Sequence, residues 1–350
     1  MAENPQAYVC IMAGGSGERF WPMSRRSTPK HLLKLFSDRT LVEETVRRLE
    51  GVVPLSHIFV LTNEAQLPAT RAALPFLPPG QIIAEPAKRD TAPAAALATG
   101  LVRARDPEAV LALLPADALI KDTAVFARQL AGALQRAAQG DALLTFAIKP
   151  TYPATGFGYL EMAEDLGGGF RRVARFVEKP DKATAERYVA GGNHAWNAGM
   201  FIWRVPAFLA EAERQAPALA KFIREFPRGD CGAYLAEKFP ALPKISVDYA
   251  IMEKAASVAT QLTAFDWDDV GAWTALPTHL PADAQGNTLR GAVVTQDAAN
   301  NIAISNGRVI ALCGVKDLVV VETPDGVLVC HRDAVQDIKH LIPKLPPELL

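Results

Sequence analysis

The sequence is poor in cysteine and shows no excess of charge of either sign. Its four cysteines (Cys10, Cys231, Cys313 and Cys330) are scattered and form no C-x-x-C pair. This excludes the common zinc and redox motifs, and their apolar surroundings predict buried free thiols. The 37 Lys and Arg residues nearly balance the 38 Asp and Glu residues. The chain therefore lacks the electrostatic footprint of a protein that binds nucleic acid or anionic lipid.

Long apolar runs are also missing. No stretch of about eighteen apolar residues could span a bilayer, and the N-terminal segment lacks the basic start and apolar stretch of a secretory signal. We therefore expect a cytoplasmic protein without membrane contact. At 350 residues the chain exceeds the usual size of one hydrophobic core, which predicts a large domain and a smaller one.

Residues 7 to about 150 alternate between short apolar runs and helix-length segments with apolar residues three and four positions apart. The expected strands cover residues 7–13, 58–61, 110–114 and 142–148, and the expected helices cover 41–49, 92–105 and 125–138. Strands this apolar are covered on both faces. The pattern predicts an α/β fold with a Rossmann-like, mainly parallel sheet between helices.

The later part of the chain has a different texture. Between about 150 and 280, strand-like pieces mix with helices, which indicates an elaboration of the same domain. After Pro281, short strands separated by Asn-Gly and Asp-Gly turn signals precede an expected helix over residues 334–344. We therefore predict one domain over residues 1–280 and a small β-rich domain with a structural role over residues 281–350.

A glycine-rich loop follows the first expected strand. Its glycines let backbone N–H groups approach a phosphate closely, and the cations Arg19, Arg25 and Lys30 follow them. Phe20 stands where a dinucleotide fingerprint needs glycine or alanine, and no P-loop string occurs. A tight turn with solvated arginines is the structural alternative. The loop itself consists of Gly14, Gly15, Ser16 and Gly17.

Residues 14–30 as a whole resemble the G-G-x-G-x-R-[LF]-x-P-[LM]-[ST]-x-x-x-P-K signature of the nucleoside-diphosphate-sugar pyrophosphorylases. The resemblance implies that residues 1–280 are a nucleotidylyltransferase catalytic domain whose loop backbone holds a nucleoside triphosphate. It also implies that Arg19 binds the β- and γ-phosphates and that Lys30 contacts phosphate. Residues 281–350 would then form a short left-handed β-helix. We expect it to share in a homodimer contact, with a capped monomer as the open alternative.

The segment that begins at Glu85 follows an expected strand over residues 81–84, and Thr91 is the expected N-cap of the next helix. A well-capped helix with a charged lead-in is the local interpretation. The segment also resembles the E-P-x-x-[RK]-[DN]-T-A-P-A string of the GDP-mannose branch of the family. This implies GTP as the nucleotide, with its base and ribose beside Glu85, Arg89, Asp90 and Thr91.

Two aspartates are candidate metal ligands. Asp117 follows the strand over 110–114, at the strand end where open α/β sheets bind ligands, and Asp269 lies far downstream. A lone aspartate after a strand is more often a turn or N-cap residue. The strings around both resemble the family's L-P-A-D and W-x-D-V-G-[ST]-W segments, with alanine at position 272. The resemblance implies that both bind Mg²⁺, which takes few protein ligands and completes its octahedron with phosphate oxygens and water.

Three further strings, at residues 155–160, 176–180 and 196–201, also match the family. The resemblance implies that the backbone of Gly156 and the side chains of Glu178 and Asn197 hold sugar hydroxyls. Lys179 is then expected to contact the sugar's phosphate. Taken singly, a Glu-Lys pair is usually a solvated strand end.

The reaction implied by the resemblance needs no general base. A sugar 1-phosphate is mostly dianionic near neutral pH, because the second pKa of a phosphate monoester is about 6. We expect mannose 1-phosphate to attack the α-phosphorus of GTP in line, with Arg19, Lys30 and Lys179 as the catalytic cations and Mg²⁺ as the cofactor. The alternatives are another hexose or heptose 1-phosphate, and a non-catalytic paralogue that senses a GDP-sugar. Such a paralogue should have lost one of these groups.

Overall fold

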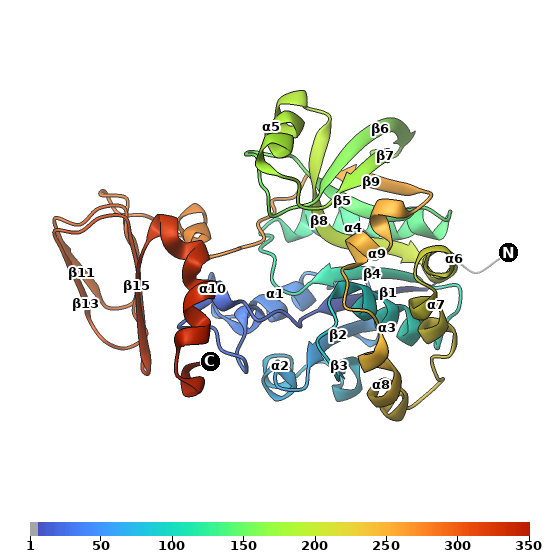
Figure 1. Cartoon of the computed structure of the whole chain (residues 1–350), viewed down its shortest axis with the longest axis horizontal. Helices are drawn as coiled ribbons and strands as arrows, with labels where there is room; N and C mark the ends of the chain where they lie inside the picture. Colours follow the sequence, from blue (N-terminus) through green and yellow to red (C-terminus); the bar gives the residue numbers. More distant parts are fainter. Residues whose placement is uncertain (1–5) are drawn as a thin grey trace.

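The computed structural model describes residues 6–350, which form two units (Figure 1). Within these residues the larger unit holds a nine-stranded sheet of order β3-β2-β1-β4-β8-β5-β9-β7-β6. Its strands are β1 (Ala7–Met12), β2 (Ile58–Asn63), β3 (Ile82–Glu85), β4 (Val110–Pro115), β5 (Leu143–Ile148), β6 (Tyr159–Gly167), β7 (Phe170–Val177), β8 (His194–Arg204) and β9 (Val258–Leu262).

The first four strands of this sheet are parallel, as predicted. β1 pairs with both β2 and β4, and β2 pairs with β3. Beyond β4 the sheet is mixed, because β8 is antiparallel to its three partners, β4, β5 and β6, and β6 and β7 form an antiparallel hairpin. The predicted α/β fold class is confirmed, and the antiparallel strands are the elaboration expected after residue 150.

Helices cover both faces of the sheet. Along β1, Tyr8 and Cys10 enter one hydrophobic cluster, whereas Val9 and Ile11 enter the cluster on the other face. This alternation follows from the period of two in a strand. The helices of the large unit are α1 (Leu41–Arg47), α2 (Leu67–Ala73), α3 (Thr91–Arg103), α4 (Thr123–Ala138), α5 (Lys182–Gly191), α6 (Val205–Gln215), α7 (Pro217–Arg224), α8 (Gly232–Lys238) and α9 (Val247–Ala250).

The C-terminal unit is a β-helix, as predicted. Strands β10, β12 and β14 stack in parallel, and so do β11 and β13. Buried Asn301 donates through Nδ2 to Oδ1 of buried Asn287 at 3.0 Å, which joins successive turns. The strands are β10 (Thr288–Arg290), β11 (Val293–Gln296), β12 (Ile302–Ile304), β13 (Ile310–Cys313), β14 (Leu318–Thr323) and β15 (Gly326–His331). The handedness of the helix and the boundary at residues 280 and 281 stay predictions.

Two local predictions need correction. The segment 334–344 contains only a short α-helix, α10 (Ile338–Leu341), between two 3₁₀ turns. Pro343 lacks the backbone N–H that a continuous helix needs. The prediction that the cysteines are buried holds for Cys10 but is wrong for Cys313, which is exposed because it alternates with inward-facing Leu312 along β13. No helix within residues 6–350 is long and apolar enough to cross a membrane.

The two units share a third hydrophobic cluster, which we call the junction cluster. It joins Phe20, Trp21 and Trp273 of the large unit to residues of the β-helix and of the segment around α10, including buried Val335 and Ile338. Trp273 Nε1 donates to the Trp21 carbonyl at 3.1 Å, and Trp21 Nε1 donates to the Leu349 carbonyl at 3.0 Å. Figure 1 shows α10 between the β-helix and the large unit.

Candidate active site

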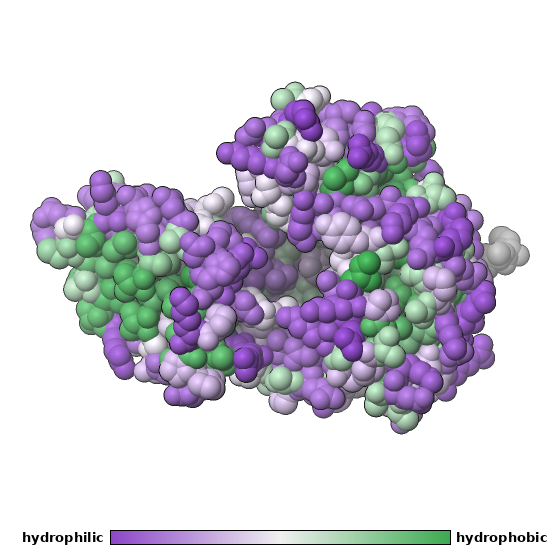
Figure 2. All heavy atoms as spheres, in the orientation of Figure 1, coloured by the Kyte–Doolittle hydropathy of each residue, from purple (hydrophilic) through white to green (hydrophobic). Residues whose placement is uncertain are grey.

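The candidate site lies where β1 and β4 run side by side. β1 continues into the glycine-rich loop, and β4 continues into the loop that carries Asp117. Ala116 N donates to the Met12 carbonyl at 3.0 Å, which keeps the two loops together. The strand order reverses direction at this point, and such a switch point opens a ligand crevice in α/β sheets. Figure 2 shows this face of the molecule hollowed at its centre.

A first cavity, of about 280 Å³, lies on the nucleotide side of this crevice. Most of the predicted nucleotide-binding residues line it together, which the chain order alone could not show. Ser16 and Gly17 lie further along the loop and do not line it. The predicted residues that do are Gly14, Gly15, Glu85, Arg89, Asp90 and Thr91.

Asp90 is the N-cap of α3, so the prediction that Thr91 caps this helix is wrong. The Asp90 carboxylate accepts from the Thr91 backbone N–H at 2.7 Å, and its backbone adopts a φ of 72°. Thr91 is the first residue of the helix, and its hydroxyl instead accepts from Val247 N at 2.9 Å. The segment before α3 is thereby tied to α9, beside the sugar side of the site.

Glu85 ends β3 at the wall of the first cavity. Burial raises the pKa of its carboxyl to about 8. Its Oε2 lies 3.5 Å from the point that a Cβ atom on Gly14 would occupy. A methyl group at position 14 would make ordinary van der Waals contact with this carboxyl.

The two predicted metal ligands lie on either side of Lys30. Nζ of Lys30 is 2.9 Å from Oδ2 of Asp117 and also donates to the Asp269 carbonyl. Burial raises the pKa of Asp269, and the nearby carboxylates of Asp268 and Asp117 add to the rise, whereas Lys30 opposes it. Hard carboxylate oxygens crowded in this way fit Mg²⁺. Within residues 6–350 no three His, Cys, Asp or Glu side chains gather as a metal site, so a bound ion would need phosphate and water ligands.

The position of Asp269 depends on a strained neighbour and a fixed turn. Val270 has a φ of 47°, which is unusual for a β-branched residue, but its side chain is fully buried in the junction cluster. Asp268 accepts from Val270 N at 2.7 Å, and its other oxygen lies 2.7 Å from His279 Nε2. No spacing in the sequence indicates this pair, because it forms only through the turn.

Helix α1 supports the loop that carries Asp117. The buried guanidinium of Arg48 donates to the Ala118 carbonyl at 3.1 and 3.2 Å, and the Thr45 hydroxyl donates to the Ala116 carbonyl at 3.2 Å. The carbonyls on both sides of Asp117 are thus held from one helix. Sequence reasoning missed both residues, since nothing in an amphipathic helix marks a buried arginine as a loop support.

A second cavity, of about 220 Å³, lies on the sugar side and is lined by Asp117, Gly156, Glu178, Asn197, Asp248 and Asp269. Lys179 does not line this cavity, but its Nζ pairs with Oε1 of Glu178, which does, at 2.9 Å. Burial alone lowers the pKa of Lys179, but the hydrogen bond and charge of Glu178 produce a net rise. Three of the predicted sugar-phosphate residues, Gly156, Glu178 and Asn197, are therefore brought together, and Lys179 lies beside them.

Asp248 is a site residue that the sequence did not reveal. Asp248 Oδ1 accepts from Asn197 Nδ2 at 3.2 Å, and Asp248 lines the second cavity. Burial raises its pKa to about 7, with Glu178 adding to the rise. An acidic residue within the otherwise apolar α9 was the only signal in the sequence.

A third cavity, of about 760 Å³, adjoins the second and shares Gly156, Phe157 and Asp269 with it. Arg19 lines this cavity together with Gln336 and Lys339 of the C-terminal unit. The sequence had suggested only a structural role for that unit. Its side chains nevertheless line a cavity of the candidate site.

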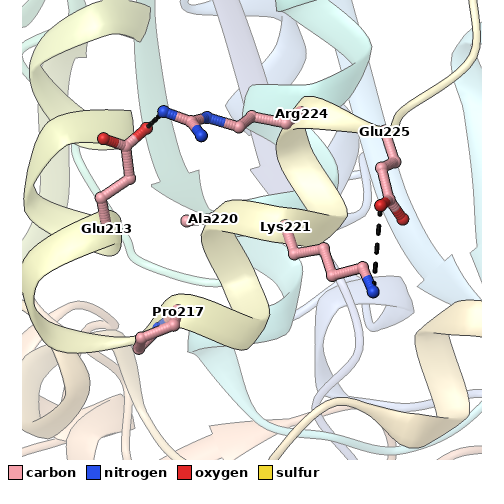
Figure 3. A pocket seen from close by; sticks show the side chains of 6 residues that line it. All are labelled: Glu213, Pro217, Ala220, Lys221, Arg224 and Glu225. Atoms are coloured by element: carbon pink, nitrogen blue, oxygen red, sulfur yellow. Dashed lines mark ion pairs between the residues drawn. The ribbon is translucent and has the colours of Figure 1, made fainter.

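A separate surface hollow of about 330 Å³ lies between α6 and α7, away from the crevice. Figure 3 shows its charged side chains paired with one another, Glu213 with Arg224 and Lys221 with Glu225. Because the charged side chains that line the hollow pair with one another, we interpret it as a feature of the helix surface and not as a binding site.

Comparison with known proteins assigns both parts of the chain to known families. Residues 8–286 match the nucleotidyl transferase family, and residues 291–345 match the MannoseP isomerase/GMP-like β-helix domain. The chain is 37% identical to the alginate biosynthesis protein AlgA of Pseudomonas aeruginosa, over 96% of this chain and 71% of that protein. It is also 37% identical to a mannose-1-phosphate guanylyltransferase of Klebsiella pneumoniae, over 95% and 72%.

The fold agrees with a solved relative. A crystal structure from Thermus thermophilus, described as a mannose-1-phosphate geranyltransferase, matches with a TM-score of 0.88 at 33% identity, over 97% of this chain and 99% of that one. The predicted relationship to the sugar-nucleotide pyrophosphorylases is confirmed. The chain belongs to the nucleotidyl transferase family, and its residues 291–345 form a MannoseP isomerase/GMP-like β-helix domain.

Proposed function

We propose that the chain transfers GMP from GTP to α-D-mannose 1-phosphate and releases pyrophosphate. One observation carries the proposal: the sugar-side cavity, which Asp117 and Asp269 both line, shares Pro115 with the nucleotide-side cavity and Asp269 with the cation-lined cavity. A transfer between a nucleoside triphosphate and a sugar phosphate needs these three compartments. The names of the relatives add support for guanine and mannose.

The proposed mechanism relies on positioning and charge. Asp117 and Asp269 would hold Mg²⁺, which supplies Lewis-acid stabilisation of phosphate oxygens when bound. Arg19 and Lys30 would hold the β- and γ-phosphates, and Lys179 would orient the sugar phosphate for direct in-line attack. The sugar phosphate is already anionic, so no proton needs to be removed and no covalent enzyme intermediate forms.

Glu85 supports the choice of guanine. The Watson–Crick edge of guanine presents adjacent N1–H and N2–H donors, which suit a carboxylate with two acceptor oxygens. Adenine presents no such pair of donors. A carboxyl whose pKa burial raises to about 8 would ionise when it accepts both hydrogen bonds.

The alternatives differ in what they require of the site. A guanylyltransferase for another hexose or heptose 1-phosphate would use the same three cavities. A non-catalytic paralogue that senses a GDP-sugar is disfavoured, because Arg19, Lys30, Asp117 and Lys179 are all present: Arg19 and Asp117 line adjoining cavities, and the two lysines pair with the cavity residues Asp117 and Glu178.

A homodimer remains part of the proposal. Val294, Val309, Val327 and Val329 of the C-terminal unit are 52% to 69% exposed, and Figure 2 shows apolar surface over this unit. Contiguous exposed apolar surface favours association. Placement in the cytoplasm stays a prediction from the sequence.

A pyrophosphate-release assay tests the proposal. Four nucleoside triphosphates are crossed with mannose, glucose and heptose 1-phosphates in the presence of Mg²⁺. We expect GTP with mannose 1-phosphate to exceed the other nucleotides in kcat/KM by about a hundredfold or more, because hydrogen bonds to one base leave groups unpaired with another. Equal rates with dTTP would contradict the choice of guanine, and absence of turnover with every pair would favour the sensing paralogue.

A further inference from the structure

The largest of the three cavities has walls from both units of the chain. They include Arg19 and Asp269 of the large unit and Gln336 and Lys339 of the C-terminal unit. Nη1 of Arg19 donates a hydrogen bond to Oε1 of Gln336 at 3.0 Å. A guanidinium and an ammonium group from distant parts of the sequence therefore line one polar space next to a predicted metal ligand.

The junction cluster fixes these groups relative to one another. Phe20, Val270 and Ile338 are all buried in it. Each is the sequence neighbour of one of the polar residues above, namely Arg19, Asp269 and Lys339. Close packing allows buried side chains little displacement. The packing therefore fixes the backbone of Lys339 beside the site, while its own side chain is exposed.

The order of the cavities indicates what this space receives. In the proposed reaction the nucleoside occupies the cavity beside Glu85, and the sugar phosphate occupies the cavity beside Asn197. The third cavity meets the sugar-side cavity at Gly156 and Asp269. In an in-line displacement the leaving group departs on the side opposite the nucleophile. The cavity beside Arg19 is the remaining space for the leaving pyrophosphate, and it adds cationic donors for phosphate oxygens.

We propose that the C-terminal unit completes the pyrophosphate site. Lys339 contacts the β- and γ-phosphates of the nucleotide and the released pyrophosphate, and Gln336 is a positioning residue that orients the Arg19 guanidinium. This inference rests on the proposed function and deepens it. It gives the β-helix unit a part in substrate binding in addition to its packing role.

Pyrophosphate binding by the full-length chain tests the role of Lys339. We expect Lys339→Met to raise the Kd for pyrophosphate about tenfold in the presence of Mg²⁺, because one charge-assisted hydrogen bond is lost. Titration calorimetry measures this Kd. The KM for pyrophosphate in the reverse reaction with GDP-mannose should rise similarly, whereas the KM for mannose 1-phosphate should not change. Lys339→Arg should restore most of the affinity.

Lys344→Met is the matched control, because Lys344 is an exposed lysine that follows α10 and lies outside the cavity. It should bind pyrophosphate as the wild type does. An unchanged affinity in Lys339→Met, or an equal loss in Lys344→Met, would overturn the role of Lys339. Wild-type turnover is measured first: its absence contradicts the proposed function, whereas normal turnover with unchanged pyrophosphate affinity contradicts only this inference.

A double-mutant cycle tests the role of Gln336. If Gln336 acts through Arg19, Gln336→Ala should weaken pyrophosphate binding several-fold in the wild type and have no effect in an Arg19→Met background. A purely structural role would produce additive losses. Additivity in the cycle would therefore overturn the positioning role.

Discussion

Nζ of Lys30 lies 2.9 Å from Oδ2 of Asp117, and this ion pair joins the loop after β1 to the loop after β4. Lys30 is mostly buried, and it also donates to the Asp269 carbonyl. The ammonium group of Lys30 thus compensates the negative charge of Asp117, and a bound metal ion would compensate the same charge. Metal binding and phosphate binding should therefore both depend on the contacts of Lys30.

Asp117→Asn should abolish most of kcat and leave the fold intact. The substitution preserves shape but removes the charge of a proposed metal ligand, and metal assistance contributes several kcal/mol, so we expect a loss of about a hundredfold or more. Steady-state kinetics at several Mg²⁺ concentrations, with circular dichroism as the folding check, measures this. Asp141→Asn, at a side chain that is 82% exposed, is the control. Undiminished turnover of Asp117→Asn would remove Asp117 from the metal site.

Lys179→Met and Arg19→Met should have separate kinetic signatures. Lys179 pairs with Glu178 on the sugar side, whereas Arg19 lines the third cavity. We expect the first variant mainly to raise the KM for mannose 1-phosphate and the second mainly to weaken productive use of GTP, each by about tenfold or more. Initial rates with each substrate varied in turn distinguish them. If both variants changed only the KM for GTP, the assignment of Lys179 would be wrong.

Glu85→Gln should change how stability depends on pH. The folded-state pKa of Glu85, about 8, lies above the ordinary value of 4.5. The carboxyl therefore favours the folded state most strongly below pH 4.5, and this contribution is lost as the pH rises through 8. Relative to Glu85→Gln, the wild type should lose up to roughly 1 kcal/mol of unfolding free energy per pH unit in this range. Urea unfolding at several pH values measures the difference.

The same variant gives an independent kinetic test. Glu85→Gln should raise the KM for GTP about tenfold while affecting ATP little, because only guanine is proposed to donate two hydrogen bonds to the carboxylate. In the stability test, parallel pH profiles for the wild type and Glu85→Gln would show that the carboxyl is not buried as described. Equal changes with GTP and ATP would remove Glu85 from base recognition.

Gly17→Ala should destabilise the phosphate loop. Gly17 has a φ of 61°, and an added Cβ would overlap Lys30 Cβ and lie 2.8 Å from the Lys30 backbone nitrogen. We expect a loss of about 1–3 kcal/mol in stability and a large loss of activity, since Lys30 must move. Gly132→Ala, within α4 and with open space at its Cβ position, should instead stabilise the protein by up to about 1 kcal/mol. Thermal unfolding of both variants tests the contrast.

A double substitution on the β-helix tests the homodimer. Val309 and Val329 are 69% and 62% exposed, and lysine at both positions should dissociate a dimer that buries them without affecting the fold. Light scattering coupled to size exclusion measures the mass of each form. A wild-type monomer, or a dimer that persists in the double variant, would contradict a contact through these residues.

Local order along the chain explains which parts of the site the sequence could predict. Glu85 and Asp117 each end or follow a strand of the parallel half of the sheet, and the βα order brings the carboxyl ends of such strands to one edge. Asp248 could not be placed in this way, because its contact with Asn197 depends on the antiparallel insertion of β8. The pairing of β8 is decided by tertiary packing rather than by its own residues.

Long-range contacts account for the other omissions. Gln336 meets Arg19 because the C-terminal unit packs on the large unit. Asp268 meets His279 through a turn whose strained Val270 is compensated by burial. Neither contact has a periodic or spacing signal in the sequence. Thr91 was a plausible cap by residue type, and only the backbone shows that Asp90 fills that position.

The junction cluster limits how the two units can be recombined. Trp21 and Trp273 are buried against the C-terminal unit, and Trp21 donates to a carbonyl beside the last residue of the chain. A chimera that takes its β-helix from a distant relative would inherit a mismatched surface unless it also exchanged the tryptophan-bearing segments around residues 21 and 273. The segment to be exchanged therefore does not end where the two units meet in the sequence. Protein engineers should graft the β-helix together with the loops that it packs on.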